Sequence, residues 1–299
     1  GSNGLLGQKL MHLLHQPEYK NRFEAIASSR GDNRLSEIPG LQYQSLDICN
    51  REMVKEVVGQ IRPDVIINTA AMTQVDLCES EREKCWQLNV ESVQHLVEDS
   101  KENDAFLVHL STDFIFDGID GPYPEDAPTN PLSYYGESKL ASEKVLMDSE
   151  ISWAIARTVL VYGITESMSR SNIILWVKKS LEAGKDIHVV TDQWRSPTLA
   201  EDLAVGCLLI AEQEAEGVFN ISGKDFLTPY EIAIATADYF KLNKSLIHPT
   251  DASRFSQAAK RPPRTGFIID KAREVLGYKP RSFEEGIALL SQQLAIYSN

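Results

Sequence analysis

A tyrosine and a lysine stand four residues apart in the segment NPLSYYGESKLASEKV, which spans residues 130–145. In a helix, residues at this spacing share one face, so Tyr135 and Lys139 would be neighbours. A tyrosine that exchanges protons near neutral pH needs its phenolate stabilised, because its ordinary pKa is about 10. Lys139 can supply the positive charge. The spacing is that of a catalytic pair, and the alternative is two surface side chains on an amphipathic helix.

The segment VHLSTDFIFDG brings polar side chains to the end of an apolar run. The run ends in Ser111, Thr112 and Asp113, and Thr112 precedes Tyr135 by 23 residues. The carboxyl ends of parallel strands are where α/β folds place their chemistry. Together with the Tyr-Lys pair, this strand end makes a catalytic site the favoured interpretation.

A glycine-rich segment, GSNGLLGQKLMHLLH, begins the chain, with glycines at positions 1, 4 and 7. Glycines spaced in this way let a backbone approach a pyrophosphate at the positive end of the following helix. The alternatives are a frayed terminus and a cloning remnant. A dinucleotide loop normally follows a central apolar strand, without which neighbouring strands have unpaired edges. We therefore expect the native protein to carry a further strand of about five or six residues before Gly1.

The second expected strand ends in Ser28, Ser29 and Arg30. An NAD-specific site usually has a carboxylate at this point for the ribose hydroxyls. Hydroxyls and a guanidinium suit a 2′-phosphate instead, so the sequence favours NADPH. Asp32 keeps NADH as an alternative cofactor. A further alternative is that residues 30–33 form a solvated turn with no role in cofactor binding.

Apolar, β-rich stretches alternate with helical patterns along the first half of the chain. They read FEAIASS, REMVKEVVGQIRP, DVIINTAA, EKCWQLNVESVQHLVEDSKEND and AFLVHLSTDFIF. This alternation is typical of βαβ units and predicts an α/β fold with a doubly wound parallel sheet of the Rossmann type. Further strands are expected in SWAIARTVLVYG and GVFNISG, and helices at 134–148, 171–183, 200–213 and 229–240.

The pattern also predicts how the chain is divided. We expect a dinucleotide-binding domain over residues 1–162, with later returns near 198–222. After Gly163 the alternation loosens, and segments of helical period are joined by loops rich in Pro, Arg and Thr. Residues 163–299 are therefore expected to form mainly a smaller, mostly helical substrate-binding lobe built from insertions.

Composition and charge exclude several classes of function. A formal net charge of −13 disfavours nucleic-acid binding, because the phosphate backbone would be repelled. No apolar run approaches the roughly 20 residues that a bilayer helix needs, so we expect a soluble, cytoplasmic protein without a membrane partner. The four cysteines are scattered without a CxxC pair, which predicts no disulfide. His12 and His15 fit a solvated helix face better than a metal site, and no metal is predicted.

The motifs together resemble the extended short-chain dehydrogenase/reductases, and within them the dTDP-4-dehydrorhamnose reductase family. The resemblance rests on the glycine loop, RPDVIINTAAMTQVDLCESE, LSTDFIFDG, YYGESKLASEK, DQWRSPT and RPPRTGFIIDKAREVLGY, and it covers nearly the whole chain. It implies that Tyr135 protonates the substrate oxygen. Lys139 would hold the nicotinamide ribose and lower the tyrosine pKa, and Thr112 would hydrogen-bond the 4-keto group.

The same resemblance implies a set of cofactor-binding residues besides Tyr135 and Lys139. Asp47 and Ile48 would lie near the adenine, and Asn68 would lead the segment that lines the cofactor path. For Asn68 a capping role after its strand is the alternative, and for Asp47 a turn. The full set is Gly1, Asn3, Gly4, Leu5, Leu6, Gly7, Ser29, Arg30, Asp47, Ile48, Asn68, Ala71, Met72 and Thr73.

Substrate contacts are expected from Thr112 and Asp113, and from Trp194, Arg195 and Arg261 on the side of the second lobe. The last three are candidates for the diphosphate or base, with a surface salt bridge as the alternative for either arginine. The family often has a Ser-Trp pair where this chain reads RTVLVY at 157–162. Related sugar-nucleotide dehydratases have an acid after Thr-Asp, where this chain has Phe114, so reduction is preferred to water loss.

The function that the resemblance implies is NADPH-dependent reduction of a nucleotide-linked 4-keto sugar, above all dTDP-4-dehydrorhamnose to dTDP-L-rhamnose. The first alternative is a non-catalytic, NADP-binding regulatory subunit similar to the β subunit of methionine adenosyltransferase. The second is a reductase or epimerase acting on another nucleotide sugar. We expect a monomer or homodimer. Lys9 stands where members of the family with a metal-linked dimer carry an acid.

Overall fold

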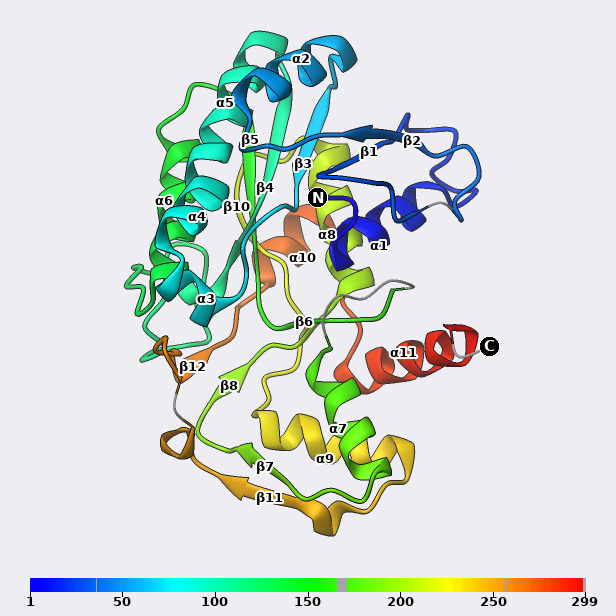
Figure 1. The fold of residues 1–299 in the computed structure, drawn as a ribbon, viewed down its shortest axis with the longest axis vertical. Helices are drawn as coiled ribbons and strands as arrows, with labels where there is room; N and C mark the ends of the chain where they lie inside the picture. The colour runs from blue at the N-terminus through cyan, green and yellow to red at the C-terminus, as the bar shows by residue number, and fades with distance from the viewer. Residues whose placement is uncertain (36, 166–170, 256, 298–299) are drawn as a thin grey trace.

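A parallel sheet of four strands, in the order β10-β5-β4-β3, forms the centre of the larger part of the molecule (Figure 1). The computed structural model describes residues 1–35, 37–165, 171–255 and 257–297. Every neighbouring pair in this sheet is parallel. The strands are β3 (Val65–Asn68), β4 (Phe106–Thr112), β5 (Trp153–Thr158) and β10 (Gly217–Asn220).

The first two strands of the chain form a separate parallel pair, β1 (Ile26–Ser29) and β2 (Gln42–Ser45). The glycine loop lies against β1, where the Ser2 amide donates to the Ser28 carbonyl at 2.8 Å. It leads into α1 (Leu5–Leu14). No described strand joins β1 to β3. The strand expected before Gly1 stays a prediction.

Alternate residues of the central strands face two separate apolar layers. Phe106 and Val108 of β4 pack in one core with α1, α8 (Ala200–Gln213) and α10 (Asp270–Leu276). Leu107 packs in a second core with α2, α5 and α6. Helices therefore cover both faces of the sheet, which confirms the doubly wound parallel α/β fold.

Two helices of the second layer, α2 and α6, begin at polar caps. Asn50 accepts from the Met53 amide at the start of α2 (Arg51–Ile61), and Ser133 accepts from the Gly136 amide at the start of α6 (Tyr134–Met147). The helix expected through residues 83–104 is interrupted, because a π-turn separates two α-helices. These segments are α3 (Val75–Ser80), α4 (Arg82–Trp86), the π-turn η1 (Gln87–Glu91), α5 (Ser92–Asn103) and the 3₁₀ turn η2 (Asp113–Ile115).

The single strand expected in SWAIARTVLVYG is wrong, because the chain turns within it. β5 ends at Thr158, and Leu160 has a φ of 38°, which a strand does not allow. The following β6 (Val161–Tyr162) pairs with β9 (Thr198–Leu199), outside the central sheet. The turn carries the chain from the sheet toward the second lobe (Figure 1).

The second lobe contains helices and short strand pairs below the central sheet (Figure 1). β7 pairs with β11 and β8 pairs with β12. The sequence pattern indicates a mostly helical lobe and does not predict these strand pairs. Runs of two to four residues carry too little alternation to be read from sequence. The lobe comprises α7 (Ile173–Glu182), β7 (Ile187–Val190), β8 (Trp194–Arg195), α9 (Pro229–Phe240), η3 (Lys244–Leu246), β11 (Ile247–Thr250), η4 (Ala252–Arg254), β12 (Arg264–Thr265) and α11 (Phe283–Tyr297).

Within the residues that the structure describes, no helix has the length and apolar character needed to cross a membrane. The division of the chain at residue 162 stays a prediction.

A buried ion pair fastens α6 to the sheet. The Arg157 guanidinium of β5 donates to both carboxylate oxygens of Glu143 on α6, at 3.0 and 2.7 Å. The exposed side-chain fractions are 4% for Arg157 and 0% for Glu143. A third donor atom of Arg157 bonds the Glu125 carbonyl at 2.7 Å. Arg157 has Glu143 as its buried ion-pair partner, and the Glu143 carboxylate also acts on Lys139.

Removing one partner of this pair should destabilise the fold strongly. We predict that Glu143→Ala lowers the free energy of unfolding by about 3–5 kcal/mol, because Arg157 is left as an unpaired buried charge. Urea unfolding, followed by circular dichroism, measures this loss. Glu150→Ala is the matched control, since the Lys101–Glu150 pair is exposed and should contribute little. Similar unfolding midpoints for the two variants would contradict the structural role of the pair.

Candidate active site

Tyr135 and Lys139 lie in the interior of the molecule. They are 8% and 2% exposed, at the first two turns of α6. The helix approaches the chain after β4 so closely that a Cβ on Gly136 would lie 2.2 Å from the Phe114 carbonyl oxygen. The alternative of two surface side chains is therefore wrong.

Burial raises the pKa of the Tyr135 phenol, and a hydrogen bond with the Thr112 side chain offsets part of that increase. Lys139 contacts another side chain in the structure, so its expected lowering of this pKa stays a prediction. Its Nζ lies 2.9 Å from Nε2 of His109 on β4. The phenol therefore carries its proton at neutral pH, and a hydroxyl of Thr112 lies beside it. A protonated phenol is the state that a proton donor requires.

Burial also lowers the pKa of Lys139, to about 8, although the Glu143 carboxylate acts in the opposite direction. The sequence analysis did not single out His109, since a histidine within an apolar strand gives no signal of its partner. Its contact with Lys139 depends on the packing of α6 on β4, which only the folded chain shows.

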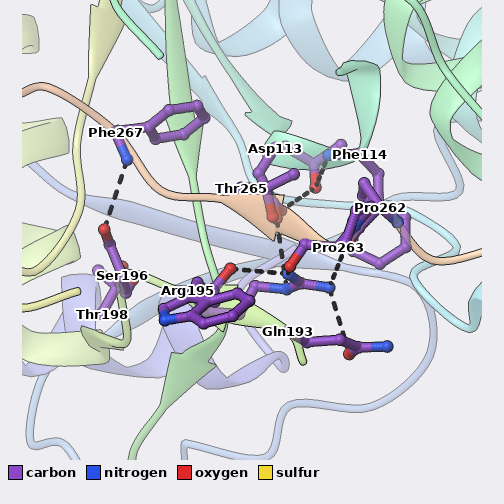
Figure 2. Close-up of polar contacts among 12 residues, drawn as sticks. Asp113, Phe114, Gln193, Arg195, Ser196, Thr198, Pro262, Pro263, Thr265 and Phe267 are labelled. Carbon is purple, nitrogen blue, oxygen red and sulfur yellow. Dashed lines mark hydrogen bonds and ion pairs between the residues drawn. The ribbon is translucent and has the colours of Figure 1, made fainter. Parts of the chain in front are cut away.

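Asp113 connects the end of β4 to the second lobe. Its carboxylate accepts a hydrogen bond from Thr112 at 3.1 Å and another from the Thr265 hydroxyl of β12. The Arg195 Nε lies 3.9 Å from the same carboxylate. Burial raises the pKa of Asp113, and the positive charge of Arg195 opposes that shift. Figure 2 shows Thr265 and the Arg195 guanidinium close to Asp113.

Arg195 is buried, with an exposed fraction of 6%. Its two terminal nitrogens donate to the carbonyl oxygens of Trp194, Pro262 and Pro263 at 2.7–3.2 Å (Figure 2). The alternative of a surface salt bridge is wrong for this arginine. Arg195 holds the loop before β12 against β8, and its predicted contact with substrate stays a prediction.

Arg261 and Trp194 occupy other parts of the same edge. Arg261 forms a two-pronged ion pair with Asp76 of α3, at 3.1 and 2.6 Å, and its side chain is 20% exposed. The Trp194 ring is half-buried beneath the Arg264 guanidinium, 5.5 Å from the ring centre. The pairing that was the alternative role of Arg261 is therefore present, and it joins α3 to the second lobe.

The glycine loop is shaped by close backbone approach. A Cβ on Gly1 would lie 2.3 Å from the Thr69 hydroxyl oxygen, and a Cβ on Gly7 would lie 2.3 Å from the Gly1 carbonyl oxygen. Gly4 is the N-cap of α1, which has no side-chain cap and no acid in its first turn. The first amides of this helix, at Leu5 and Leu6, therefore suit a phosphate anion.

Asn3 fixes the loop to the segment after β1. Its side chain donates to the Asp32 carbonyl at 2.8 Å and accepts from the Arg34 amide at 3.0 Å. These bonds place the loop beside the end of β1, where Ser29 and Arg30 lie.

The residues expected near the adenine and 2′-phosphate gather at the ends of β1 and β2. The Ser29 carbonyl accepts from the Tyr43 hydroxyl at 3.0 Å. Arg30 has an 80% exposed side chain whose nearest acid is Asp47, 3.9 Å away. Ile48 follows, and its carbonyl lies 3.1 Å from a ring nitrogen of His95. A largely exposed guanidinium is available to an incoming phosphate.

The segment after β3 carries the other expected cofactor residues, Asn68, Ala71, Met72 and Thr73. Asn68 accepts from the Ala70 amide at 3.1 Å, which is the capping role weighed for it. Asn89, within the π-turn η1, holds the Met72 backbone at both ends, at 2.8 and 3.1 Å. It also donates to Ser138 of α6 at 3.0 Å. Sequence reasoning missed Asn89, because the π-turn that aims it inward has no sequence pattern.

No cluster of three or more His, Cys, Asp or Glu side chains suitable for a metal ion occurs within the described residues. His15 bonds the Met11 carbonyl of its own helix at 2.8 Å.

A cavity of about 510 Å³ lies in the second lobe, between the start of α7, β7 and the region of η4. Two aromatic side chains, Trp176 and Phe255, line it, each 41% exposed. Gln193 lines it as well and accepts from Arg195 at 3.5 Å. Polar contacts therefore lead from the cavity through Gln193, Arg195 and Asp113 to Thr112.

The chain matches the family described as the RmlD substrate binding domain over residues 1–296. It is 29% identical over 293 residues to methionine adenosyltransferase 2 subunit beta from Bos taurus, with 96% of this chain and 84% of that protein covered. It is also 29% identical over 300 residues to dTDP-4-dehydrorhamnose reductase from Aggregatibacter actinomycetemcomitans, with 96% and 95% covered.

Among solved structures, the chain is similar to a dTDP-4-dehydrorhamnose reductase from Bacillus anthracis in complex with NADP. The TM-score is 0.81 at 28% identity, and the match covers 98% of this chain and 97% of that one.

The exposed Arg30 provides a test of cofactor choice. We predict that Arg30→Ala weakens NADPH binding by about 10- to 100-fold, because a charge-assisted contact to phosphate contributes about 1.5–3 kcal/mol. NADH binding should change little. Fluorescence titration of the two reduced cofactors measures both affinities. Arg273→Ala, on α10, is the control arginine and should affect neither. Equal losses for NADPH and NADH would remove the 2′-phosphate role.

Proposed function

The chain belongs to the RmlD substrate binding domain family and is an NAD(P)-dependent oxidoreductase, and we propose that it reduces the 4-keto group of a nucleotide-linked sugar with NADPH. The family resemblance seen in the sequence is thereby confirmed. The observation that carries the proposal is the burial of Thr112, Tyr135 and Lys139 together at the carboxyl end of β4. A hydroxyl, a phenol and an amine in one interior site are the groups that carbonyl reduction needs.

The reaction adds a hydride to carbon 4 and a proton to its oxygen, which converts a ketone into an alcohol. A bound nicotinamide supplies the hydride. Tyr135 donates the proton from its phenol, which burial keeps protonated at neutral pH. Thr112, whose hydroxyl donates to Asp113 in the structure, would turn that hydroxyl toward the same oxygen and so stabilise the charge that develops there. Lys139 binds the cofactor ribose and stabilises the tyrosinate left after proton transfer.

We assign the cofactor as NADPH on the chemistry at the end of β1. Ser29 and the exposed Arg30 offer a hydroxyl and a guanidinium to a 2′-phosphate. The Bacillus anthracis reductase structure is a complex with NADP, which supports this choice. Asp47 and Asp32 leave NADH as the second candidate.

We propose dTDP-4-dehydrorhamnose as the substrate and dTDP-L-rhamnose as the product, on the relatedness to the Aggregatibacter reductase. The cavity beside Trp176 and Phe255 has the size and aromatic walls to hold a nucleotide base. Asp113 and Arg195 lie along the route from that cavity to Thr112. We place the reaction in the cytoplasm, with the protein acting as a monomer or homodimer.

Similarity to the methionine adenosyltransferase subunit supports a second candidate function, a non-catalytic regulatory subunit. In that case the buried site would bind NADP without turnover, and the chain would act through a complex with a larger enzyme. A reductase or epimerase of another nucleotide sugar is the third candidate. The buried Thr112, Tyr135 and Lys139 favour catalysis over a purely regulatory role.

Tyr135→Phe separates the catalytic from the regulatory candidate. The substitution keeps the buried ring and removes the acidic proton. Turnover of the 4-keto sugar should fall by about 10²- to 10⁴-fold, the usual contribution of a positioned general acid. Steady-state NADPH oxidation measures the loss, and NADPH titration should show an almost unchanged affinity.

The matched control for this variant is Tyr134→Phe on the same helix. Tyr134 is only half-buried and lies against Trp86, so its substitution should leave turnover within a fewfold of the unmodified protein. Nearly full activity of Tyr135→Phe would overturn the proposed mechanism. A stable complex with another enzyme that persists in Tyr135→Phe, in a protein without turnover, would instead establish the regulatory candidate.

A further inference from the structure

A buried chain of side chains leads from the end of β3 to Lys139. Asn68 Nδ2 lies 3.2 Å from Nδ1 of His109, and Nε2 of the same ring lies 2.9 Å from Lys139 Nζ and 3.0 Å from Ser142 Oγ. All four residues are at most 5% exposed. Neither the Tyr135 step nor the cofactor contacts described above account for this arrangement.

The backbone around Asn68 determines where the His109 proton lies. The Ala70 amide donates to Asn68 Oδ1 at 3.1 Å, which fixes the orientation of the side-chain amide. Its NH₂ group therefore faces His109 Nδ1, and an NH₂ group can only donate. Nδ1 must accept, so the proton of the neutral ring is on Nε2.

The second end of the ring then presents an N–H to Lys139. Ser142 donates its own hydrogen to the Lys139 carbonyl at 2.7 Å, so its oxygen is an acceptor toward the ring. An amine at Lys139 can also accept from Nε2–H, whereas an ammonium would place two donors opposite each other. Moving the proton to Nδ1 would create the same conflict with Asn68.

The surroundings of Lys139 add to this bias. The titratable groups that act on it from the described elements are His109 on β4, Glu143 on α6 and Cys85 on α4. Burial lowers the pKa of Lys139 to about 8, and Glu143 and Cys85 oppose the shift. His109 is fully buried, and burial lowers its pKa well below the usual range, which keeps the ring neutral.

We propose that Asn68 and His109 are positioning residues for Lys139: Asn68 keeps the ring proton on Nε2, and this N–H favours the amine form of Lys139 in the free protein, so that Lys139 takes up a proton when the cofactor binds. The proposal rests on the proposed function in one respect, namely that Lys139 meets the cofactor ribose. The ribose hydroxyl oxygens would accept hydrogen bonds from the Lys139 ammonium, which His109 cannot do because its Nε2–H is a donor. Cofactor binding would thereby charge the lysine that the reaction needs.

The position of the ring proton can be measured without cofactor or substrate. In protein labelled with ¹⁵N-histidine, two-bond ¹⁵N–¹H correlation spectra distinguish a protonated from an unprotonated ring nitrogen. The six histidines can be assigned by difference, with His109→Gln identifying the relevant signals. We expect His109 to carry its proton on Nε2. A proton on Nδ1 would overturn the proposal, whatever activity the protein has.

The second measurement counts protons taken up when the oxidised cofactor binds, by titration calorimetry in buffers of different ionisation enthalpy. About half of Lys139 is uncharged at pH 8, so about half a proton per cofactor should be taken up there. Uptake should fall toward zero at pH 6, where Lys139 is already charged. Lys139→Met should abolish the uptake at pH 8, which identifies the proton as that of Lys139.

Variants at Asn68 and Ser142 distinguish the effect of the His109 tautomer on Lys139 from the effect of burial alone. In Asn68→Asp the new carboxylate accepts a hydrogen bond from a protonated Nδ1. Nε2 then becomes an acceptor for the Lys139 ammonium, so proton uptake at pH 8 should at least halve. Asn68→Ala releases the ring without adding a charge and should act in the same direction. Ser142→Ala leaves the contact of Asn68 with Nδ1 in place, so the ring proton should stay on Nε2 and the uptake at pH 8 should not fall.

Equal uptake in the unmodified protein and in both Asn68 variants would overturn the proposal. These results are independent of the proposed reaction, because each is expressed per cofactor bound and none requires a sugar substrate. A different outcome is that the protein shows the expected tautomer and proton uptake, yet none of the 4-keto sugars tested is a substrate for NADPH oxidation. That outcome would contradict the proposed function and leave the present proposal intact.

Discussion

Burial of an ionisable lysine at the end of the central sheet is the constraint on which the rest of the site depends. Lys139 is 2% exposed, so it can be charged only where opposite charge or acceptors are built around it. Glu143, one turn further along α6, is in turn held by Arg157 of β5. The close packing that brings α6 to this depth requires Gly136, whose Cα lies against the backbone after β4. Catalytic geometry and fold stability are therefore supported by the same contacts.

The second lobe is attached at the same strand end. Asp113 accepts from Thr112 on one side and from Thr265 on the other, with Arg195 beside it (Figure 2). The two arginines expected to bind substrate are occupied differently, Arg195 by backbone carbonyls and Arg261 by Asp76. Both stabilise the contact between the lobe and the sheet. A change in the position of the lobe would consequently be transmitted to Thr112.

The sequence identified the features that depend on local pattern. The Tyr135–Lys139 spacing, the glycine loop and the βαβ alternation are short-range signals, and α6 and the doubly wound sheet follow from them. His109 and Asn89 escaped notice because their partners lie 30 and 49 residues away, on another element. The break at Leu160 was missed because apolar residues continue through it. Long-range contacts, and backbone turns within apolar runs, can be identified only in the folded structure.

Deuteride transfer from NADPH to a sugar would show directly whether the protein reduces a 4-keto group. Purified protein would be incubated with NADPH deuterated on the nicotinamide ring and with a panel of nucleotide-linked 4-keto sugars, including dTDP-4-dehydrorhamnose. We expect at least one product to carry deuterium on carbon 4, the carbon that bears the newly formed hydroxyl. Tight binding of the cofactor with no deuterium in any sugar would contradict it.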